Sequence, residues 1–342
     1  MPTWGEILTE LNNSTDANGR PDFDSVRRRY LLDLHHLTGR AVILYATAWF
    51  ESRPIPPGEL QIGLPDIQGL MEAVSNIHER NLDVILHSPG GSAEAAESLV
   101  EYLRQRFDHI RFFVPTAAMS AATMMALSAD ELVMGQHSQL GPIDPQFIIT
   151  TPEGPRSAPA KAILNQFELA KRECKVPENL AAWMPILRTY APGLLTQCED
   201  SQRLASDMVA GWLERYMMAG EENAAEKSRR VADWFADYES FRSHGRRVGR
   251  DQARAVGLTV VDLEENNKLQ DAVLSVHHAT MHTFAGTPAQ KIIENHHGRA
   301  WVRMGAAVQI PSDPAHLNIP PANEPDPRGT RSARRRQRRG RR

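Results

Sequence analysis

The chain has 342 residues, enough for one large domain or two modest ones, and its 41% hydrophobic and 24% charged residues are ordinary for a globular enzyme. The net charge of −3 is unevenly spread, because residues 326–342 hold nine Arg and one Asp and leave 30 basic against 41 acidic residues in the rest. No apolar run is long enough to span a membrane, and the N-terminus has no secretory signal pattern, so we expect a cytoplasmic protein.

The first half of the chain alternates between helical and strand patterns. Residues 1–22 are expected to form a polar arm, followed by a helix at 23–37 and an apolar strand at 41–50. Further helices are expected at 65–80, 92–107 and 119–129, and further strands at 82–88, 110–115 and 131–135. Apolar strands that alternate with amphipathic helices predict an α/β fold, with a parallel sheet covered on both faces.

The second half is mainly helical. Residues 158–240 carry recurring Met, Trp and Tyr, which indicate core or subunit interface, and residues 244–263 close the fold with a loop, a short helix and a strand. We expect one domain at 23–285 that includes the helical segment, then a C-terminal extension at 286–325. A sheet alone cannot cover so many apolar positions in the helical segment, and this predicts a homo-oligomer.

The tail at 326–342 has no apolar face to bury, and we expect it to be disordered. Its arginines suit nucleic acid, where each phosphate contact releases counterions. A purely solubilising tail is the competing interpretation.

Two short motifs follow predicted strands. Ser88–Gly91, SPGG, joins a strand to a helix, and its glycines permit a turn whose free N–H groups suit an anion or a developing oxyanion. Ser120 stands among small residues at the start of the next helix but one, 29 residues after Gly91. Each motif alone is weak, since a tight turn or an N-cap serine explains it. Together, at the carboxyl ends of neighbouring parallel strands, they form the arrangement that acyl transfer needs.

The segments LHSPGG and VPTAAMSAATMMALSADELVMGQHSQLGPIDPQ resemble the serine dehydrogenase proteinase family. That family belongs to the clan of the Clp protease proteolytic subunit and signal peptide peptidase A. The resemblance covers roughly residues 25–265. It implies a Clp/crotonase-like parallel sheet of repeated strand–helix units, with a helical insertion and oligomerisation region, and a serine peptidase that acts on polypeptides without a cofactor.

By this resemblance Ser120 is the nucleophile, and the backbone N–H groups of Gly91 and Ala121 form the oxyanion hole. Gly91→Val should then keep the fold near intact and lower turnover roughly 100-fold or more. The chain departs from the family at Ala122, where members usually have Gly, and the added methyl is expected to narrow the substrate groove or lower activity.

The general base has two candidate sources. Asp144 stands where the Clp proteolytic subunit has its histidine, and His244 stands near the place of its aspartate, so the two roles are exchanged in a Ser120–His244–Asp144 triad. Signal peptide peptidase A instead pairs its serine with a lysine, and Lys161 and Lys171 lie at suitable positions for such a dyad.

Other site types find little support. The two cysteines lack metal-type spacing, and the histidine pairs at 277–278 and 296–297 lack the partners expected of a zinc site, so no metal is expected. Two alternative functions remain: a crotonase-like acyl-CoA enzyme, which also uses a backbone oxyanion hole, and a catalytically weak scaffold that binds nucleic acid through the tail.

Overall fold

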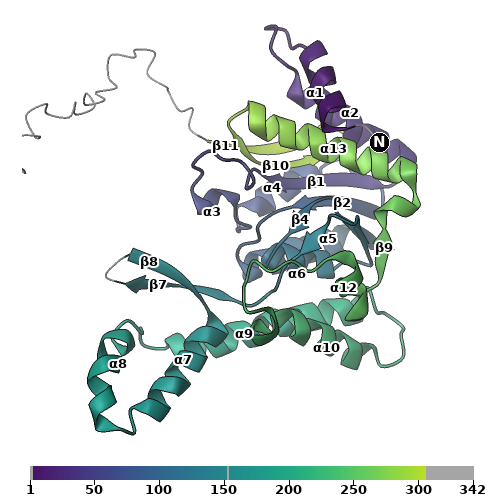
Figure 1. Cartoon of the computed structure of the whole chain (residues 1–342). Coiled ribbons are helices and arrows are strands. Elements are labelled where there is room, and N and C mark those ends of the chain that lie inside the picture. Colours follow the sequence, from purple (N-terminus) through teal and green to yellow (C-terminus); the bar gives the residue numbers. More distant parts are fainter. Residues whose placement is uncertain (1–2, 152–153, 306–342) are drawn as a thin grey trace, which may run out of the picture. The chain divides into compact units, whose positions relative to one another are not determined.

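The structure, a computed structural model, describes residues 3–151 and 154–305 (Figure 1). Its helices are α1 Trp4–Asn13, α2 Phe23–Thr38, α3 Pro57–Leu60, α4 Asp66–Ala73, α5 Ala93–Arg106, α6 Ala121–Leu127, α7 Ala160–Glu173, α8 Leu180–Leu187, α9 Leu194–Arg215, α10 Ala224–Ala236, α11 Tyr238–Phe241, α12 Arg250–Ala255 and α13 Asn267–Gly286. Its strands are β1 Ala41–Thr47, β2 Asn81–His87, β3 His109–Val114, β4 Ala117–Ala118, β5 Glu131–Met134, β6 Gln139–Leu140, β7 Gln146–Thr151, β8 Gly154–Pro159, β9 Val260–Asp262, β10 Ala289–Asn295 and β11 Ala300–Met304. Two 3₁₀ turns lie at Pro177–Asn179 and Leu263–Glu265.

A seven-stranded sheet in the order β11-β10-β1-β2-β3-β5-β9 forms the centre of the fold. The strands β1, β2, β3, β5 and β9 run parallel, while β10 and β11 are antiparallel to their neighbours. The predicted α/β class with a largely parallel sheet is thereby confirmed.

Both faces of the central strands are buried, which explains the apolar runs in β1 and β2. Successive side chains of β1 point to opposite faces. Ile43 and Tyr45 pack into the larger core, with residues of α4, α5, α6, α9 and α10. Val42 and Leu44 pack into a second core with α2 and α13, which cover the other face. A register slip of one residue would exchange these two sets, so the apolar pattern fixes the pairing.

The N-terminal residues do not form the expected polar arm. They contain α1, which is closed by a capping box between Thr3 and Glu6. Its Ile7 and Leu11 are buried against Val26 and Ala279. Two apolar side chains one helical turn apart are thus enough to dock this short helix.

The expected boundary at residue 285 is also wrong, because β10 and β11 are strands of the central sheet. β10 is fully buried beside β1, and the compact unit continues to Gly305. Of the expected 286–325 extension, residues 306–325 lie outside the described residues, as does the whole tail at 326–342.

The helical segment begins after a hairpin that the sequence does not reveal. β7 and β8 pair antiparallel, and β8 extends to Pro159. α7 packs on α9 around a small separate cluster that contains Ile163 and Cys198. α8 has no buried residue. The side chains of its Leu180 and Met184 are therefore open to solvent in the single chain.

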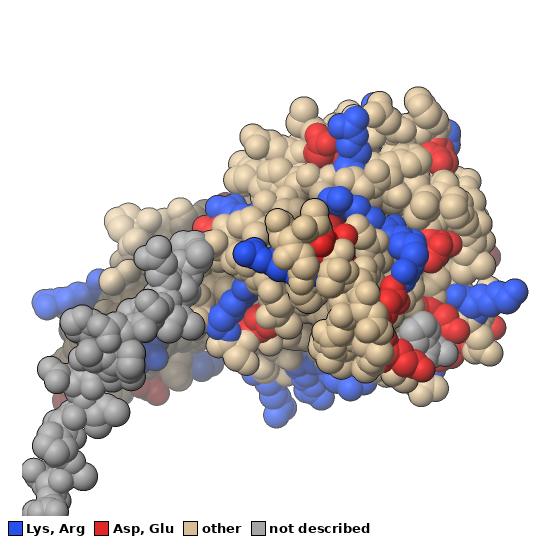
Figure 2. Space-filling model, turned by 90° about the horizontal axis from the view of Figure 1, so that it is seen from above, with Lys and Arg blue, Asp and Glu red and all other residues tan. Residues whose placement is uncertain are grey.

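Charged side chains are distributed over several elements. Figure 2 shows basic and acidic side chains interspersed on the face seen from above. Some pair across elements, such as Arg80 with Asp108 at 2.6 Å and Arg229 with Asp207 at 2.7 Å. Both pairs are largely exposed, so each contributes little to stability.

Candidate active site

Ser120 lies directly before α6, with φ 52° and ψ −122°. Positive φ is uncommon for a residue with a side chain and costs free energy that its surroundings must offset. Although Ser120 is the N-cap residue, its hydroxyl makes no capping hydrogen bond. The Ser120 side chain therefore does not serve as a helix cap, and its hydroxyl is available to another molecule.

The glycine turn after β2 lies against the Ser120 segment. A Cβ atom on Gly90 would come within 2.4 Å of the Met119 carbonyl oxygen. A Cβ atom on Gly91 would come within 2.3 Å of the Ile62 carbonyl oxygen. Both contacts are with backbone atoms, which cannot move aside as the end of a flexible side chain can. Gly91→Val therefore cannot leave the local fold intact, contrary to the expectation from sequence.

The Gly91 turn is also paired as a short strand. Ile62 N–H donates to the Gly90 carbonyl at 2.8 Å, and Ser92 N–H donates to the Ile62 carbonyl at 3.0 Å. Within the described residues, the N–H groups of Gly91 and Ala121 have no recorded hydrogen-bond acceptor. Both residues line the pocket that contains Ser120. Two free backbone donors thus border the space around the serine.

His244 and Asp144 come together although 100 positions separate them. His244 Nδ1 lies 2.7 Å from Asp144 Oδ1. The Asp144 side chain is buried, and its other oxygen accepts a hydrogen bond from Gln146 Nε2 at 2.7 Å. A carboxylate only accepts, so His244 Nδ1 carries the proton and Nε2 of the neutral ring keeps a lone pair.

The backbone around this pair explains their meeting. Leu140 and Val248 form an antiparallel bridge, with N–H to carbonyl distances of 2.9 and 2.8 Å. Ile143 N–H donates to the Phe235 carbonyl at 2.9 Å. These bonds hold the loop before β7 beside the loop after α11, so the two side chains face each other.

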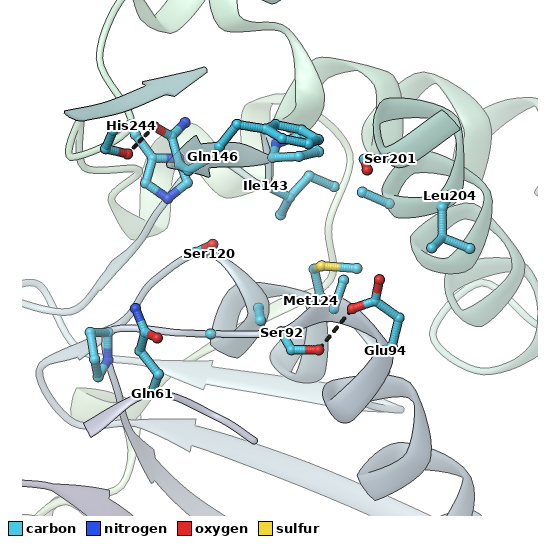
Figure 3. Close-up of a pocket in the computed structure, with 18 of the residues that line it drawn as sticks. Gln61, Ser92, Glu94, Ser120, Met124, Ile143, Gln146, Ser201, Leu204 and His244 are labelled. Atoms are coloured by element: carbon cyan, nitrogen blue, oxygen red, sulfur yellow. Dashed lines mark hydrogen bonds between the residues drawn. The ribbon is translucent and has the colours of Figure 1, made fainter. Parts of the chain in front are cut away.

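A cavity of about 560 Å³ joins these groups. In Figure 3 the His244 ring points across the pocket toward Ser120. The side of the pocket away from His244 is mainly apolar, with Met124, Ile143 and Leu204, and Glu94 stands at its edge. The pocket offers a hydroxyl, an imidazole and two N–H donors beside a space large enough for a side chain.

The structure does not bring either lysine to this pocket. Lys161 lines a separate depression with Asp233 and Tyr238. Lys171 is exposed, and its ammonium bonds Glu168 at 2.8 Å.

Ala122 does not narrow the groove as expected. Its side chain is fully buried in the core beneath α6 and is not part of the pocket wall. The methyl group therefore adds core packing and leaves the space around Ser120 unchanged.

A buried ion pair that the sequence does not signal supports the Gly91 turn. Lys291 Nζ contacts both carboxylate oxygens of Asp66 and the Gln61 carbonyl, each at 2.8 Å. Asp66 also accepts from Tyr45 at 2.6 Å. This network fixes the chain just before Ile62, the residue that pairs with Gly91. Its members are spread from position 45 to 291, so no local pattern identifies them.

The comparisons with known proteins each match part of the chain. Residues 62–177 match the model of the ClpP-like SDH-type serine proteinase family. Two uncharacterized proteins of Methanocaldococcus jannaschii, MJ0137 and MJ1495, are 35% and 34% identical over 87 residues. That is 25% of this chain and 30% of each relative, so the chain matches less than a third of their length. The resemblance to a ClpP-like serine proteinase is confirmed for the matched residues.

Solved structures give a looser likeness. A variant of the 1510-N membrane-bound stomatin-specific protease has a TM-score of 0.36 and 16% identity, and covers 62% of this chain and 79% of its own. A variant of ClpP1 from Listeria monocytogenes has a TM-score of 0.31 and 13% identity, and covers 72% of this chain and 98% of its own. Among the helices of the described residues, none combines the length and the apolar character needed to cross a membrane.

Proposed function

We propose that this chain, whose residues 62–177 match the ClpP-like SDH-type serine proteinases, is a serine peptidase that cleaves polypeptides through an acyl-enzyme at Ser120. The observation that carries the proposal is the His244–Asp144 hydrogen bond of 2.7 Å beside the pocket of Ser120. A serine hydroxyl is a weak nucleophile until a neighbouring base takes its proton, and this pair supplies a base in the required tautomer.

The reaction would begin when Ser120 Oγ attacks the peptide carbonyl carbon and His244 Nε2 accepts the hydroxyl proton. Asp144 keeps the ring oriented and stabilises the imidazolium. The N–H groups of Gly91 and Ala121 would donate to the oxyanion. His244 then returns the proton to the leaving amine, which leaves an ester on Ser120. A water molecule, deprotonated by His244, would hydrolyse that ester and restore the serine.

A fluorophosphonate probe tests the nucleophile, because it phosphonylates activated serines. Intact mass spectrometry should show one adduct on the wild type and none on Ser120→Ala. Ser92→Ala is the matched control, since Ser92 lines the same pocket but its hydroxyl bonds Glu94 at 2.7 Å. That variant should label like the wild type.

Two results would contradict the proposal. Equal labelling of wild type and Ser120→Ala would remove Ser120 as nucleophile. A wild type that neither labels nor cleaves an unfolded polypeptide would favour the crotonase-like alternative, in which the backbone donors work without a nucleophilic serine.

A further inference from the structure

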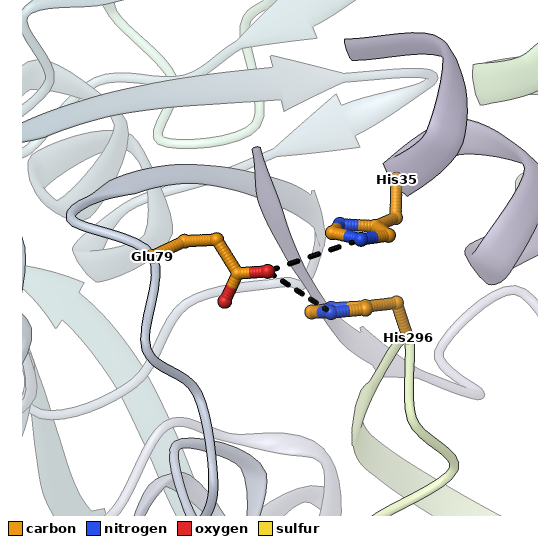
Figure 4. Close-up of side chains that lie close together, drawn as sticks. All are labelled: His35, Glu79 and His296. Carbon is orange, nitrogen blue, oxygen red and sulfur yellow. Dashed lines mark ion pairs between the residues drawn. The ribbon is translucent and has the colours of Figure 1, made fainter. Parts of the chain in front are cut away.

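Three side chains of metal-ligating type meet far from Ser120. They are His35 on α2, Glu79 in the segment before β2, and His296 directly after β10, and their ligand atoms lie within 4.8 Å of one another. Figure 4 shows the Glu79 carboxylate directed at both imidazoles. Its Oε1 lies 3.8 Å from His35 Nε2 and 4.0 Å from His296 Nε2. The three residues are remote in sequence, which is why the histidine pair at 296–297 lacks visible partners there.

The His35 ring has a defined tautomer. Its Nδ1 lies 2.8 Å from the Arg40 carbonyl oxygen. A carbonyl only accepts, so Nδ1 carries the proton and Nε2 of the neutral ring presents a lone pair. That lone pair faces a carboxylate oxygen, and a cation between the two atoms, either a proton or a metal ion, stabilises this arrangement. A carbonyl that holds the outer nitrogen is also the usual support of a metal-ligating histidine.

His296 supplies a second nitrogen to the same space. Its side chain is fully buried, and its Nε2 has no hydrogen-bond partner among the described residues. Val42 N–H donates to its Nδ1 at 3.1 Å, and the Val42 carbonyl oxygen lies 3.4 Å from the same nitrogen. A cation on Nε2 would select the tautomer in which Nδ1–H donates to the Val42 carbonyl.

We propose that His35, Glu79 and His296 bind a divalent transition-metal ion, with zinc as the best chemical match. Two imidazoles and one carboxylate are a zinc ligand set, with water in the fourth position. His35 and Glu79 are partly exposed, at 18% and 29% of their side chains, which provides entry for the ion and room for the water.

Ion binding requires small movements. Ligand atoms around tetrahedral zinc lie about 3.3 Å apart, so the carboxylate moves inward by about half an ångström. The two rings are stacked, with centroids 4.0 Å apart and planes 13° apart. They must tilt so that both Nε2 lone pairs point to the ion. This rotation falls mainly to His35, whose side chain is 18% exposed, because His296 is fully buried.

The position of the cluster assigns it a structural role. Val42, next to His296, is near the start of β1, and Glu79 precedes β2, so the cluster lies at the amino ends of the parallel strands. Ser120 and Gly91 lie beyond their carboxyl ends. An ion would join α2, the segment before β2 and the end of β10, and would stabilise the folded state because the unfolded chain has no such site. This inference does not depend on the peptidase proposal.

Zinc binding is measured on the full-length protein by equilibrium dialysis with metal analysis, and by cobalt substitution in visible absorption. We expect one zinc per chain at this site, intense tetrahedral cobalt bands and a higher thermal midpoint, which a chelator reverses. His35→Gln and Glu79→Gln should each weaken binding about 100-fold or more, since loss of a merely supporting partner already costs 10–100-fold. Cleavage and probe labelling should be unchanged in both.

Matched controls are His36→Gln, next to His35 on the same helix, and Glu101→Gln on α5, both exposed. They should bind zinc like the wild type. Far-UV circular dichroism checks that each variant is folded. A wild type without bound zinc or cobalt bands would overturn the proposal, as would folded His35 and Glu79 variants that retain the same affinity.

Discussion

His87, the last residue of β2, is fully buried and directly precedes the SPGG turn. It packs among Trp49, Phe50 and His277, and burial lowers its pKa to about 3. Burial, together with the nearby imidazoles of His87, His278 and His137, also lowers the pKa of His277. Since the folded pKa of His87 lies below the ordinary 6.5, the unfolded chain takes up a proton first as pH falls. The stability that the neutral ring contributes is complete above about pH 6.5 and is lost toward pH 3.

We predict that His87→Phe reduces this acid sensitivity. Phenylalanine keeps an aromatic ring in an aromatic environment and has no charged form. Denaturant unfolding between pH 4 and 7 should show a smaller fall in the unfolding free energy than in the wild type. His36→Phe, at an exposed position, is the control and should keep the wild-type slope. A variant with an unchanged slope would show that His87 is not the group that titrates.

Asp144 provides the sharpest residue test of the proposed triad. Asp144→Asn can accept from His244 only in one amide orientation and offers no negative charge to an imidazolium. We predict a loss in kcat of about 10⁴, the size seen when a triad aspartate is replaced. The comparison is Gln146→Ala, which removes the bond to the outer carboxylate oxygen and two longer bonds, to the Asp144 carbonyl and from Ser157, but keeps the carboxylate beside His244, and should lose far less. Full activity in Asp144→Asn would exclude the triad.

At the scale of elements, α1 offers a clean test of packing. Leu11 is 1% exposed, whereas Leu8 on the same helix is 42% exposed. We predict that Leu11→Ala lowers the unfolding free energy by about 2–4 kcal/mol, and that Leu8→Ala changes it by less than about 0.5 kcal/mol. Equal effects in denaturant unfolding would mean that α1 is not docked as described.

Elements with strong local periodicity could be predicted from the sequence. The apolar runs of β2, β3 and β5 and the amphipathic pattern of α5 specify their type, with ends displaced by one or two residues. α1 was missed because only Ile7 and Leu11 mark its buried face. β10 was missed because its inclusion depends on pairing with β1, which no local pattern encodes. Whether such a segment becomes a strand depends on its long-range partner and not on local propensity.

The candidate site also contains some residues that could be predicted from the sequence and others that could not. Ser120 and Gly91 are visible because a small-residue helix start and a glycine turn follow adjacent strands. The pairing of Asp144 with His244 was predicted through the family resemblance, and the contact is present, while their catalytic roles remain predictions. Lys291 and Asp66 were missed, since a buried ion pair across the sheet has no spacing signature.

At the scale of the whole molecule, the exposed apolar residues of α8 bear on the predicted homo-oligomer. Leu180, Met184 and Ile186 are 48%, 38% and 37% exposed. We predict that light scattering returns a multiple of 38.2 kDa. Met184→Glu should shift the mass toward the monomer, because a charge would be buried in the contact. Met71→Glu on α4, at a position 56% exposed, should not. A monomeric wild type at micromolar concentration would contradict the prediction.

The place of β10 has a consequence for synthesis on the ribosome. β1 lies between β2 and β10, and Ile43 pairs with Asn295, about 250 residues further along the chain. At about 5–20 residues per second, one edge of β1 waits some 12–50 seconds for its partner to be translated. During that interval a mainly apolar strand exposes unpaired backbone, which favours association with other nascent chains. The yield of folded protein should therefore depend on a low growth temperature or on chaperones. This dependence should be stronger than the stability of the finished domain would indicate.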